Sequence, residues 1–280
     1  MLDADVSEND TKSETLTRRL SGALARVVAQ LELDQPPVVT TADLERIIAE
    51  EDIGTAPRVL AARLRHEGWL LPLPLPGVWE FAPGAHAGPI GRGDPFILVR
   101  AISAKRPRLN PHVCGVTAMW AHSMIDRFDP RIDVAISLIG SPPASVRELV
   151  TVTRFEPRTK PDMRHQVPIL RPAALIVHAA THPTSIRWGD AHAGMAELID
   201  RIDPSELTIE VDARPESVRA RVAYLLHGVR PDLAEQVLPE QPGRVWFGPR
   251  RQVHRYCPRF GIADTLLPFD PSDLNDASGR

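Results

Sequence analysis

Apolar residues in the first third of the chain recur at the spacing of a short helix. Leu44, Ile47 and Ile48 follow one another at i, i+3 and i+4, which places them on one helical face. Thr40 stands three residues before Asp43, and a hydroxyl and a carboxylate at this interval can satisfy two free backbone N–H groups reciprocally. The pattern therefore predicts a helix that begins just after Thr40.

A second helical segment follows Gly54, which interrupts the first pattern. Thr55 is a candidate cap, and Pro57 in the first turn loses no internal hydrogen bond. Gly68 is a natural end for this helix, because a residue without Cβ adopts the left-handed conformation at little cost. The apolar face of the second helix consists of Val59, Leu60 and Leu64.

After Gly68 the spacing of apolar residues changes. Residues 69–73 and 78–81 are typical of two short strands on either side of the turn at 74–77, and Pro72 suits an edge strand because it lacks a backbone donor. Two helices joined by a turn and followed by a ribbon form the plan of a winged helix-turn-helix. The second helix of such a unit enters the DNA major groove.

The polar side of the second helix carries residue types that suit contact with DNA. On a helical wheel Arg58 and Arg65 point away from Leu60, with small residues between them. Such a face fits close approach to base edges and phosphates, whereas most arginines on exposed helices are only solvated. The residues predicted to contact DNA are Thr41, Thr55, Arg58, Ala62, Arg65 and His66 on the two helices, and Leu75 and Pro76 in the wing.

From Pro95 onward strands and helices alternate, which predicts a larger mixed α/β domain and an α+β class for the whole chain. Residues 96–99 fit either a strand or a short buried helix, and residues 158–166 are typical of a polar loop. The predicted strands are 134–139, 150–155, 167–170 and 245–247. The predicted helices are 112–126, 171–180, 191–202, 215–227 and 231–238, with a short one near Pro204.

Composition divides the chain into two domains joined by a linker. An amphipathic segment from about Ser13 to Leu33 predicts a further helix that packs across the helix-turn-helix. Gly, Pro and Ala residues after the wing indicate the linker, and polar composition at both ends indicates disorder. The predicted organisation is a disordered segment 1–10, a winged helix-turn-helix domain 11–83, a linker 84–94, an α+β domain 95–270 and a disordered tail 271–280.

The charge of the predicted DNA-binding domain is close to neutral. The whole chain has a net charge of −3, and residues 11–93 hold nine Lys and Arg against ten Asp and Glu. DNA affinity must therefore come from clustered arginines and helix-end dipoles, and from a homodimer that doubles the contacts on DNA.

Nothing in the sequence indicates export or membrane insertion. Every apolar run falls short of the roughly 18 residues that suggest a membrane span, and the acidic start of the chain does not fit a signal peptide. We therefore expect a cytoplasmic protein without membrane contact. Two cysteines, Cys114 and Cys257, form no CxxC pair, which argues against a disulfide framework or a structural zinc site.

Candidate catalytic and metal-binding residues are few. His178 and His182 stand at i, i+4, a spacing that zinc ligands use, but the zincin pattern needs a glutamate where Ala179 stands. Lys105 and Lys160 do not fit the metal-dependent nuclease core, and no Gly-x-Ser-x-Gly nucleophile elbow occurs. We therefore predict that the protein is not an enzyme and uses no metal and no cofactor.

Part of the first domain resembles the N-terminal winged helix of AbiEi-type antitoxins. In that family the recognition helix ends in a Leu–Arg–x–x–Gly–bulky–Leu phrase, and the wing closes with Gly–Val–aromatic. The corresponding residues here are Leu64-Arg65, Gly68-Trp69-Leu70 and Gly77-Val78-Trp79. A later family phrase matches loosely and with altered spacing at His112, Ala118, Trp120 and His122. The resemblance also favours a helix at 96–99.

AbiEi-type proteins are the antitoxin and repressor half of type IV, abortive-infection toxin–antitoxin systems. The resemblance implies that this chain binds double-stranded DNA at an operator in its own promoter and counteracts a nucleotidyltransferase-like toxin encoded alongside. It assigns neutralisation to the second domain and leaves open whether a stable complex is required. The alternative is a winged-helix regulator or protein-interaction module without a toxin partner, which the near-neutral first domain favours.

A basic segment with interleaved aromatic residues occupies positions 248–260. It allows three interpretations: a surface for nucleic acid, a surface for an acidic face of a partner toxin, or a solvated edge strand protected by arginines. The candidate residues of this second basic patch are Arg250, Arg251, Arg255, Tyr256 and Arg259.

Overall fold

The computed structural model describes residues 22–84, 93–241 and 243–277. The chain divides after Asp94 into two compact units, unit 1 (Met1–Asp94) and unit 2 (Pro95–Arg280). The described residues form an α+β structure, as predicted. The segment 1–10, predicted to be disordered, and the start of the first predicted helix lie outside the described residues, as does most of the predicted linker.

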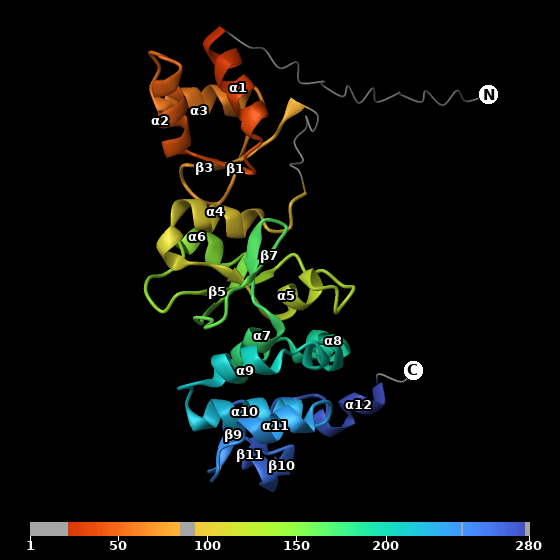
Figure 1. The fold of residues 1–280 in the computed structure, drawn as a ribbon. Helices are drawn as coiled ribbons and strands as arrows, with labels where there is room; N and C mark the ends of the chain where they lie inside the picture. The colour runs from red at the N-terminus through yellow and green to blue at the C-terminus, as the bar shows by residue number, and fades with distance from the viewer. Residues whose placement is uncertain (1–21, 85–92, 242, 278–280) are drawn as a thin grey trace, which may run out of the picture. The chain divides into compact units, whose positions relative to one another are not determined.

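Unit 1 packs helices against a small antiparallel sheet (Figure 1). The helices are α1 (Gly22–Asp34), α2 (Thr41–Glu50) and α3 (Pro57–His66). The strands β1 (Val38–Thr40), β2 (Leu70–Pro72) and β3 (Val78–Phe81) pair in the order β1-β3-β2. Leu31, Leu44, Ile47 and Leu64 lie in the apolar core that the helices share with the sheet. This arrangement is compatible with the predicted winged helix-turn-helix.

The first turn of α2 is capped as the sequence predicts. Thr40 Oγ1 accepts a hydrogen bond from the Asp43 backbone N–H at 3.2 Å, and Asp43 Oδ2 accepts one from the Thr40 N–H at 2.8 Å. The Thr40 hydroxyl also donates to Asp43 Oδ2 at 2.6 Å. This capping box fixes the point at which β1 ends and α2 begins.

The helix α3 begins and ends close to the predicted residues, with one difference. Pro57 occupies the first turn, and Gly68 has a φ of +73° just after the helix end at His66. The N-cap is Ala56, which has an extended conformation and provides no capping side chain. Thr55 therefore does not cap α3, because the chain enters the helix one residue later than the pattern predicts.

Removal of the capping carboxylate should loosen α2. We expect Asp43→Ala to lower the free energy of unfolding of unit 1 by about 1 kcal/mol, because the N–H and hydroxyl of Thr40 lose their acceptor. Hydrogen exchange of the α2 amides measures this change. The matched control is Glu45→Ala, since Glu45 is an exposed carboxylate of α2 for which the described residues provide no ion pair. Equal exchange rates in the two variants would contradict the prediction.

Unit 2 contains a five-stranded sheet of mixed direction. Its strands are β4 (His112–Val113), β5 (Ile132–Ile136), β6 (Val150–Arg154), β7 (Asp162–Arg164) and β8 (Val167–Ile169), in the order β6-β5-β4-β8-β7. Strands β5 and β6 run parallel, with Ile132 opposite Val150, whereas β4 and β5 run antiparallel. Every residue of β5 is buried, which places this strand in the core of the sheet.

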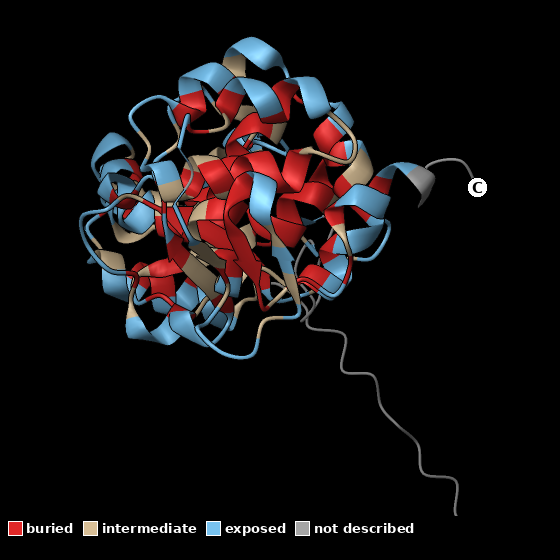
Figure 2. Cartoon of the chain, turned by 90° about the horizontal axis from the view of Figure 1, so that it is seen from below, coloured by how far each residue is buried: buried red, intermediate tan, exposed pale blue. Residues whose placement is uncertain are grey.

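Helices surround this sheet and continue beyond it along the chain. The α-helices are α4 (Ile97–Lys105), α5 (Gly115–Ala121), α6 (Ala144–Arg147), α7 (Pro172–Thr181), α8 (Trp188–Asp200), α9 (Pro204–Val211), α10 (Glu216–Leu226) and α11 (Pro231–Val237). Short 3-10 turns are η2 (Pro107–Leu109), η3 (Pro183–Ser185) and η4 (Pro258–Phe260). The apolar helix α7 is buried along most of its length and packs on α9 and α10. Figure 2 shows buried elements in the middle of the view and exposed segments around them.

A three-stranded sheet follows near the end of the chain. It consists of β9 (Val245–Phe247), β10 (Arg255–Cys257) and β11 (Ile262–Asp264), in the order β10-β11-β9. The last described elements are η5 (Pro271–Asp273) and α12 (Leu274–Ala277). Because Leu274 is buried and Asp270 accepts a hydrogen bond from the Ser272 N–H at 3.0 Å, the predicted disorder from residue 271 is wrong for residues 271–277.

The structure resolves one ambiguous element of unit 2 and corrects two others by strand pairing. In the ambiguous segment 96–99, residues 97–99 form the start of α4 and Phe96 is its N-cap. The loop predicted at 158–166 contains β7, because this strand pairs with β8. The helix predicted from His112 begins at Gly115 and ends at Ala121, since His112 and Val113 pair with β5.

Candidate functional site

The exposed side of α3 is the strongest candidate site in unit 1. Leu60, Ala61 and Leu64 turn into the core and are at most 3% exposed. Successive helical residues are rotated by about 100°. The side chains of α3 after Pro57, apart from these three, therefore span an arc of roughly 160° around the helix. We call this surface the α3 face, and its exposed residues are Arg58, Val59, Ala62, Arg63, Arg65 and His66.

The α3 face carries positive charge without an acidic residue of its own helix. The helix contains three arginines and a terminal histidine but no Asp or Glu. Within the described ranges, no carboxylate forms an ion pair with an α3 arginine, whereas Arg46 of α2 pairs with Glu50 at 2.9 Å. The guanidinium groups of α3 are therefore available to an anionic partner.

Four of the predicted DNA-contact residues lie together on the α3 face. These are Arg58, Ala62, Arg65 and His66, all exposed and spaced as neighbours on one side of a helix. Thr55 is partly exposed just before α3. The structure thus groups the predicted residues of the second helix on one accessible surface.

The predicted residues at the wing and at the start of α2 differ in accessibility. Pro76 is exposed, but Leu75 is only 1% exposed, so the side chain of Leu75 does not reach the surface. Thr41 is partly exposed, and its backbone N–H donates to the Gly77 carbonyl at 3.0 Å. This bond fixes the β2–β3 turn beside the start of α2.

Two residues of the α3 face are absent from the predicted contact set. Val59 is predicted to join the apolar face, yet it is 46% exposed. Arg63 is also exposed. A helical wheel could have predicted the exposure of Val59, because Val59 lies about 100° from Leu60 and about 140° from Leu64 around the helix.

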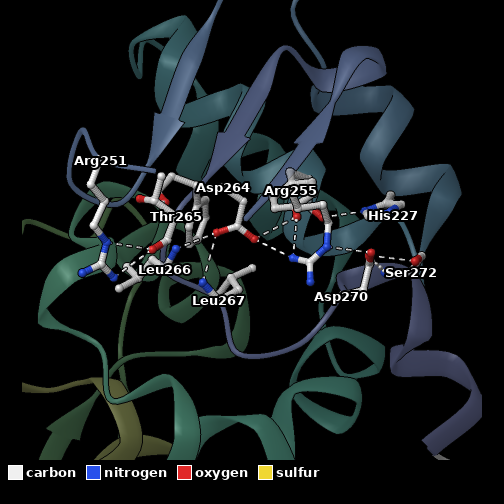
Figure 3. A network of polar contacts seen from close by, with 11 residues as sticks. His227, Arg251, Arg255, Asp264, Thr265, Leu266, Leu267, Asp270 and Ser272 are labelled. Carbon is white, nitrogen blue, oxygen red and sulfur yellow. Dashed lines mark hydrogen bonds and ion pairs between the residues drawn. The ribbon is translucent and has the colours of Figure 1, made fainter. Parts of the chain in front are cut away.

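The second candidate surface, the basic segment 248–260, is largely engaged in contacts within unit 2 (Figure 3). Arg255 forms ion pairs with Asp264 at 2.7 Å and with Asp270 at 2.8 Å. It also donates a hydrogen bond to the Tyr224 hydroxyl at 3.3 Å. The guanidinium of Arg255 is thus held by three groups of its own chain.

The carboxylate of Asp264 is the centre of this network, which Figure 3 shows from close by. Its side chain has no exposed surface, and Oδ1 accepts hydrogen bonds from the N–H groups of Leu266 and Leu267 at 2.9 and 3.0 Å. The Tyr224 hydroxyl donates to Oδ2 at 3.1 Å. Burial raises the pKa of Tyr224, which keeps this donor protonated. The network joins β11 to α10 and to the β10 strand.

The other arginines of the segment divide between internal contacts and solvent. Arg251 donates to the Thr265 carbonyl at 2.9 Å, and Arg259 pairs with Glu235. Arg250 is exposed and forms no ion pair with the part of the chain that the structure describes. Of the candidate residues of the second basic patch, Arg251, Arg255 and Arg259 therefore bind acceptors of unit 2, whereas Arg250 and Tyr256 are exposed.

Loss of the buried carboxylate should destabilise unit 2. We expect Asp264→Ala to lower its free energy of unfolding by about 3 kcal/mol, because a charged guanidinium, a phenol and two backbone N–H groups lose their acceptor. Urea denaturation monitored by tryptophan fluorescence measures the change. The control is Asp232→Ala, which removes a 60% exposed carboxylate from its ion pair with Arg230, and we expect little effect. Equal urea midpoints for the two variants would contradict this prediction.

A buried polar cluster of unit 2 contains the nucleophiles and bases that catalysis would need, but it excludes solvent. Thr153 Oγ1 lies 2.7 Å from His178 Nε2 and 3.9 Å from Cys114 Sγ. His178 and Cys114 are each 1% exposed. Burial lowers the pKa of His178 to about 3 and raises the pKa of the Cys114 thiol. A neutral histidine and a protonated, inaccessible thiol fit a structural role.

The His178–His182 pair is engaged in hydrogen bonds within unit 2. His178 Nε2 binds Thr153, and His182 Nε2 contacts the Arg154 carbonyl at 2.7 Å. The two rings are 5.5 Å apart between centroids. Among the described residues, no group of three or more His, Cys, Asp and Glu is placed to hold a metal ion.

Comparison with known proteins shows which family part of the chain is similar to. Residues 112–228 match the family model described as the AbiEi antitoxin C-terminal domain. This match supports a role as the antitoxin of a toxin–antitoxin system. The predicted resemblance to AbiEi-type antitoxins is thereby confirmed, and the segment from β4 to just beyond α10 is the part of the chain that carries it.

A solved structure has a similar fold over nearly the whole chain. It is the RV2827C protein from Mycobacterium tuberculosis, with a TM-score of 0.74, 26% sequence identity and coverage of 95% of this chain and 97% of that chain. A search of curated proteins finds no match. In the described part of the chain, no helix is long and apolar enough to cross a membrane.

Proposed function

We propose that this protein is a DNA-binding repressor and antitoxin that acts in the cytoplasm. Unit 1 binds double-stranded DNA at an operator in the promoter of its own operon, and unit 2 counteracts a nucleotidyltransferase-like toxin encoded alongside. The protein performs both roles by binding and not by catalysis. The observation that carries the DNA-binding role is the exposed, cationic α3 face without an internal counter-charge. The match to an antitoxin domain supports the second role.

The chemistry of the α3 face suits the DNA major groove. Arg58 and Arg65 can donate to phosphates or to the acceptors of guanine, and Ala62 between them permits close approach. The exposed Val59 provides an apolar contact of the kind that recognises a thymine methyl group. Pro76 in the β2–β3 turn and the hydroxyl of Thr55 supply further contact points beside the helix.

The small number of exposed cations favours a homodimer on DNA. Unit 1 is close to neutral by sequence, and non-specific attraction to DNA grows with the number of neutralised phosphates. Two copies of α3 on two half-sites double the phosphate contacts without any further basic residue. We therefore propose that the operator contains two related half-sites.

The α3 arginines should carry the salt-sensitive part of operator binding. We expect Arg58→Ala plus Arg65→Ala to weaken binding to the upstream DNA at least tenfold and to reduce the salt slope, because each arginine contributes about 1–3 kcal/mol or one phosphate contact. A gel shift at several salt concentrations measures both quantities.

The matched control for this experiment is Arg26→Ala plus Arg46→Ala. It removes the same number of cations from unit 1, but these two arginines are exposed and pair with Glu51 and Glu50. We expect the control variant to bind nearly as well as the natural chain. Equal losses of DNA affinity in the two double variants would show that only net charge matters and would contradict the proposed interface.

The antitoxin role is tested by co-expression with the neighbouring reading frame. We expect that frame to encode a nucleotidyltransferase-like protein that arrests growth, and the full chain to restore growth. Arg58→Ala plus Arg65→Ala should still restore growth from an unrelated promoter, because these residues lie outside the matched antitoxin segment. A neighbouring frame of another kind, or no restoration of growth, would refute this role.

The alternative is a regulator or protein-interaction module without a toxin partner. The near-neutral charge of unit 1 favours this alternative. It predicts salt-sensitive operator binding, or none, together with no effect on the growth of cells that express the neighbouring frame. The growth assay therefore separates the two proposals.

A further inference from the structure

The sheet formed by β9, β10 and β11 places two aromatic side chains on the face opposite to its buried network. In the register of this sheet, Ala263 of β11 stands opposite Tyr256 of β10 and Trp246 of β9. Residues aligned across neighbouring strands share a face, and successive residues alternate. These three residues therefore lie on one side of the sheet, with Ala263 between the two rings.

The next row of the same sheet shows which side faces the helices. Phe247, Asp264 and Arg255 are aligned in that row. Tyr224 of α10 packs its ring 5.9 Å from the ring of Phe247 and donates its hydroxyl to Asp264. The row that contains Trp246 consequently faces away from α10.

The two rings of this row are accessible and carry a cation above them, whereas Ala263 between them is fully buried. Tyr256 is 53% exposed and Trp246 is partly exposed. The guanidinium carbon of Arg244 lies 5.3 Å from the ring centre of Trp246 and 6.0 Å from that of Tyr256. We call Arg244, Trp246, Tyr256 and Ala263 the aromatic face.

The charged residues of the segment that carries the aromatic face are all arginines. The segment from residue 241 to 263 contains five arginines and no Asp or Glu. Two acids flank this segment in the sequence: Asp264, which is buried on the other side of the sheet and paired with Arg255, and Glu240, which is exposed. Arg244 and Arg250 have no ion pair with any described residue. An anionic partner with flat rings would meet complementary groups here.

Backbone geometry holds the start of the β9–β10 connection, which carries Arg250. Gly248 has a φ of +110°, and a Cβ at this position would lie 2.7 Å from the Thr265 hydroxyl oxygen. That hydroxyl donates to the Pro249 carbonyl at 2.8 Å. The connection therefore leaves β9 along a defined path immediately before Arg250.

We propose that the aromatic face binds single-stranded nucleic acid. Unpaired bases stack on Trp246 and Tyr256, and Arg244 and Arg250 contact the phosphates. Surfaces of this kind combine aromatic rings with a cationic path for the backbone, and each stacked base contributes a large part of the affinity. A duplex is a poorer ligand, because its bases already stack on one another. The site is distinct from the α3 face and lies outside the matched antitoxin segment.

The test uses the full chain and fluorescently labelled twelve-nucleotide oligo-U, oligo-dT and a duplex of the same length. The protein is the full chain with Arg58→Ala plus Arg65→Ala, in which the α3 face is disabled. Fluorescence anisotropy at 50 mM salt should report that this variant binds at least one of the single strands. It should bind the duplex more weakly. Equal binding of oligo-U and oligo-dT would indicate recognition through ring stacking and phosphate contacts, without a contact to the 2′-hydroxyl. Preference for oligo-U would indicate an added contact to the 2′-hydroxyl. Both outcomes support the proposal.

Substitutions in the aromatic face separate stacking from charge and from folding. We expect Trp246→Ala plus Tyr256→Ala to weaken single-strand binding at least tenfold, as the loss of two stacked bases requires. Trp246→Phe plus Tyr256→Phe should retain binding within a few-fold, because it keeps two rings. Met163→Ala is the control for loss of an exposed apolar side chain, since Met163 is 64% exposed on β7, and it should bind as the natural chain does.

Three results would overturn the proposal. The first is no binding of either single strand by the natural chain at micromolar concentration. The second is equal binding by the alanine and phenylalanine double variants. The third is capture of the purified toxin, but not of oligonucleotides, through Trp246 and Tyr256, which would make the aromatic face a protein interface.

Discussion

The burial of Leu60, Ala61 and Leu64 decides which side of α3 faces water. Each large apolar side chain contributes about 1.5–3 kcal/mol when it is buried, and Leu60 and Leu64 are at most 2% exposed. A rotation of α3 that hid its arginines would expose these leucines and would also bury guanidinium groups without partners, which costs several kcal/mol. The apolar core thus holds the cations of the α3 face outward.

Several arginines of unit 2 form hydrogen bonds and ion pairs inside the fold and do not face a partner. Arg221 donates to the carbonyls of Trp246 and Ala180 at 2.9 and 3.2 Å, and burial lowers its pKa. Arg187 binds the buried carboxylate of Asp133 at 3.1 Å. Net charge and counts of arginine therefore do not reveal a nucleic-acid surface. The discriminating quantity is whether a guanidinium has an acceptor within its own chain.

The sequence was informative where local chemistry determines the structure. The capping box at Thr40, the proline in the first turn of α3 and the positive φ of Gly68 follow from interactions within a few residues. The partners of the 248–260 segment were not predictable in this way, because Glu235 and Tyr224 come from other helices. The burial of Leu75 and the pairing of β7 likewise depend on tertiary contacts.

The segments that carry the proposed activities share no side chains. The antitoxin match ends at residue 228, α3 belongs to unit 1, and the aromatic face begins at Arg244. Effects of substitutions without shared contacts are close to additive, so changes on one surface leave the others nearly unaltered. The backbone of the aromatic face is joined to the matched segment at two points, because Arg221 donates to the Trp246 carbonyl and Tyr224 donates to Asp264, which is adjacent to Ala263 in β11. The proposed nucleic-acid contacts can therefore vary while the fold of the matched segment is maintained.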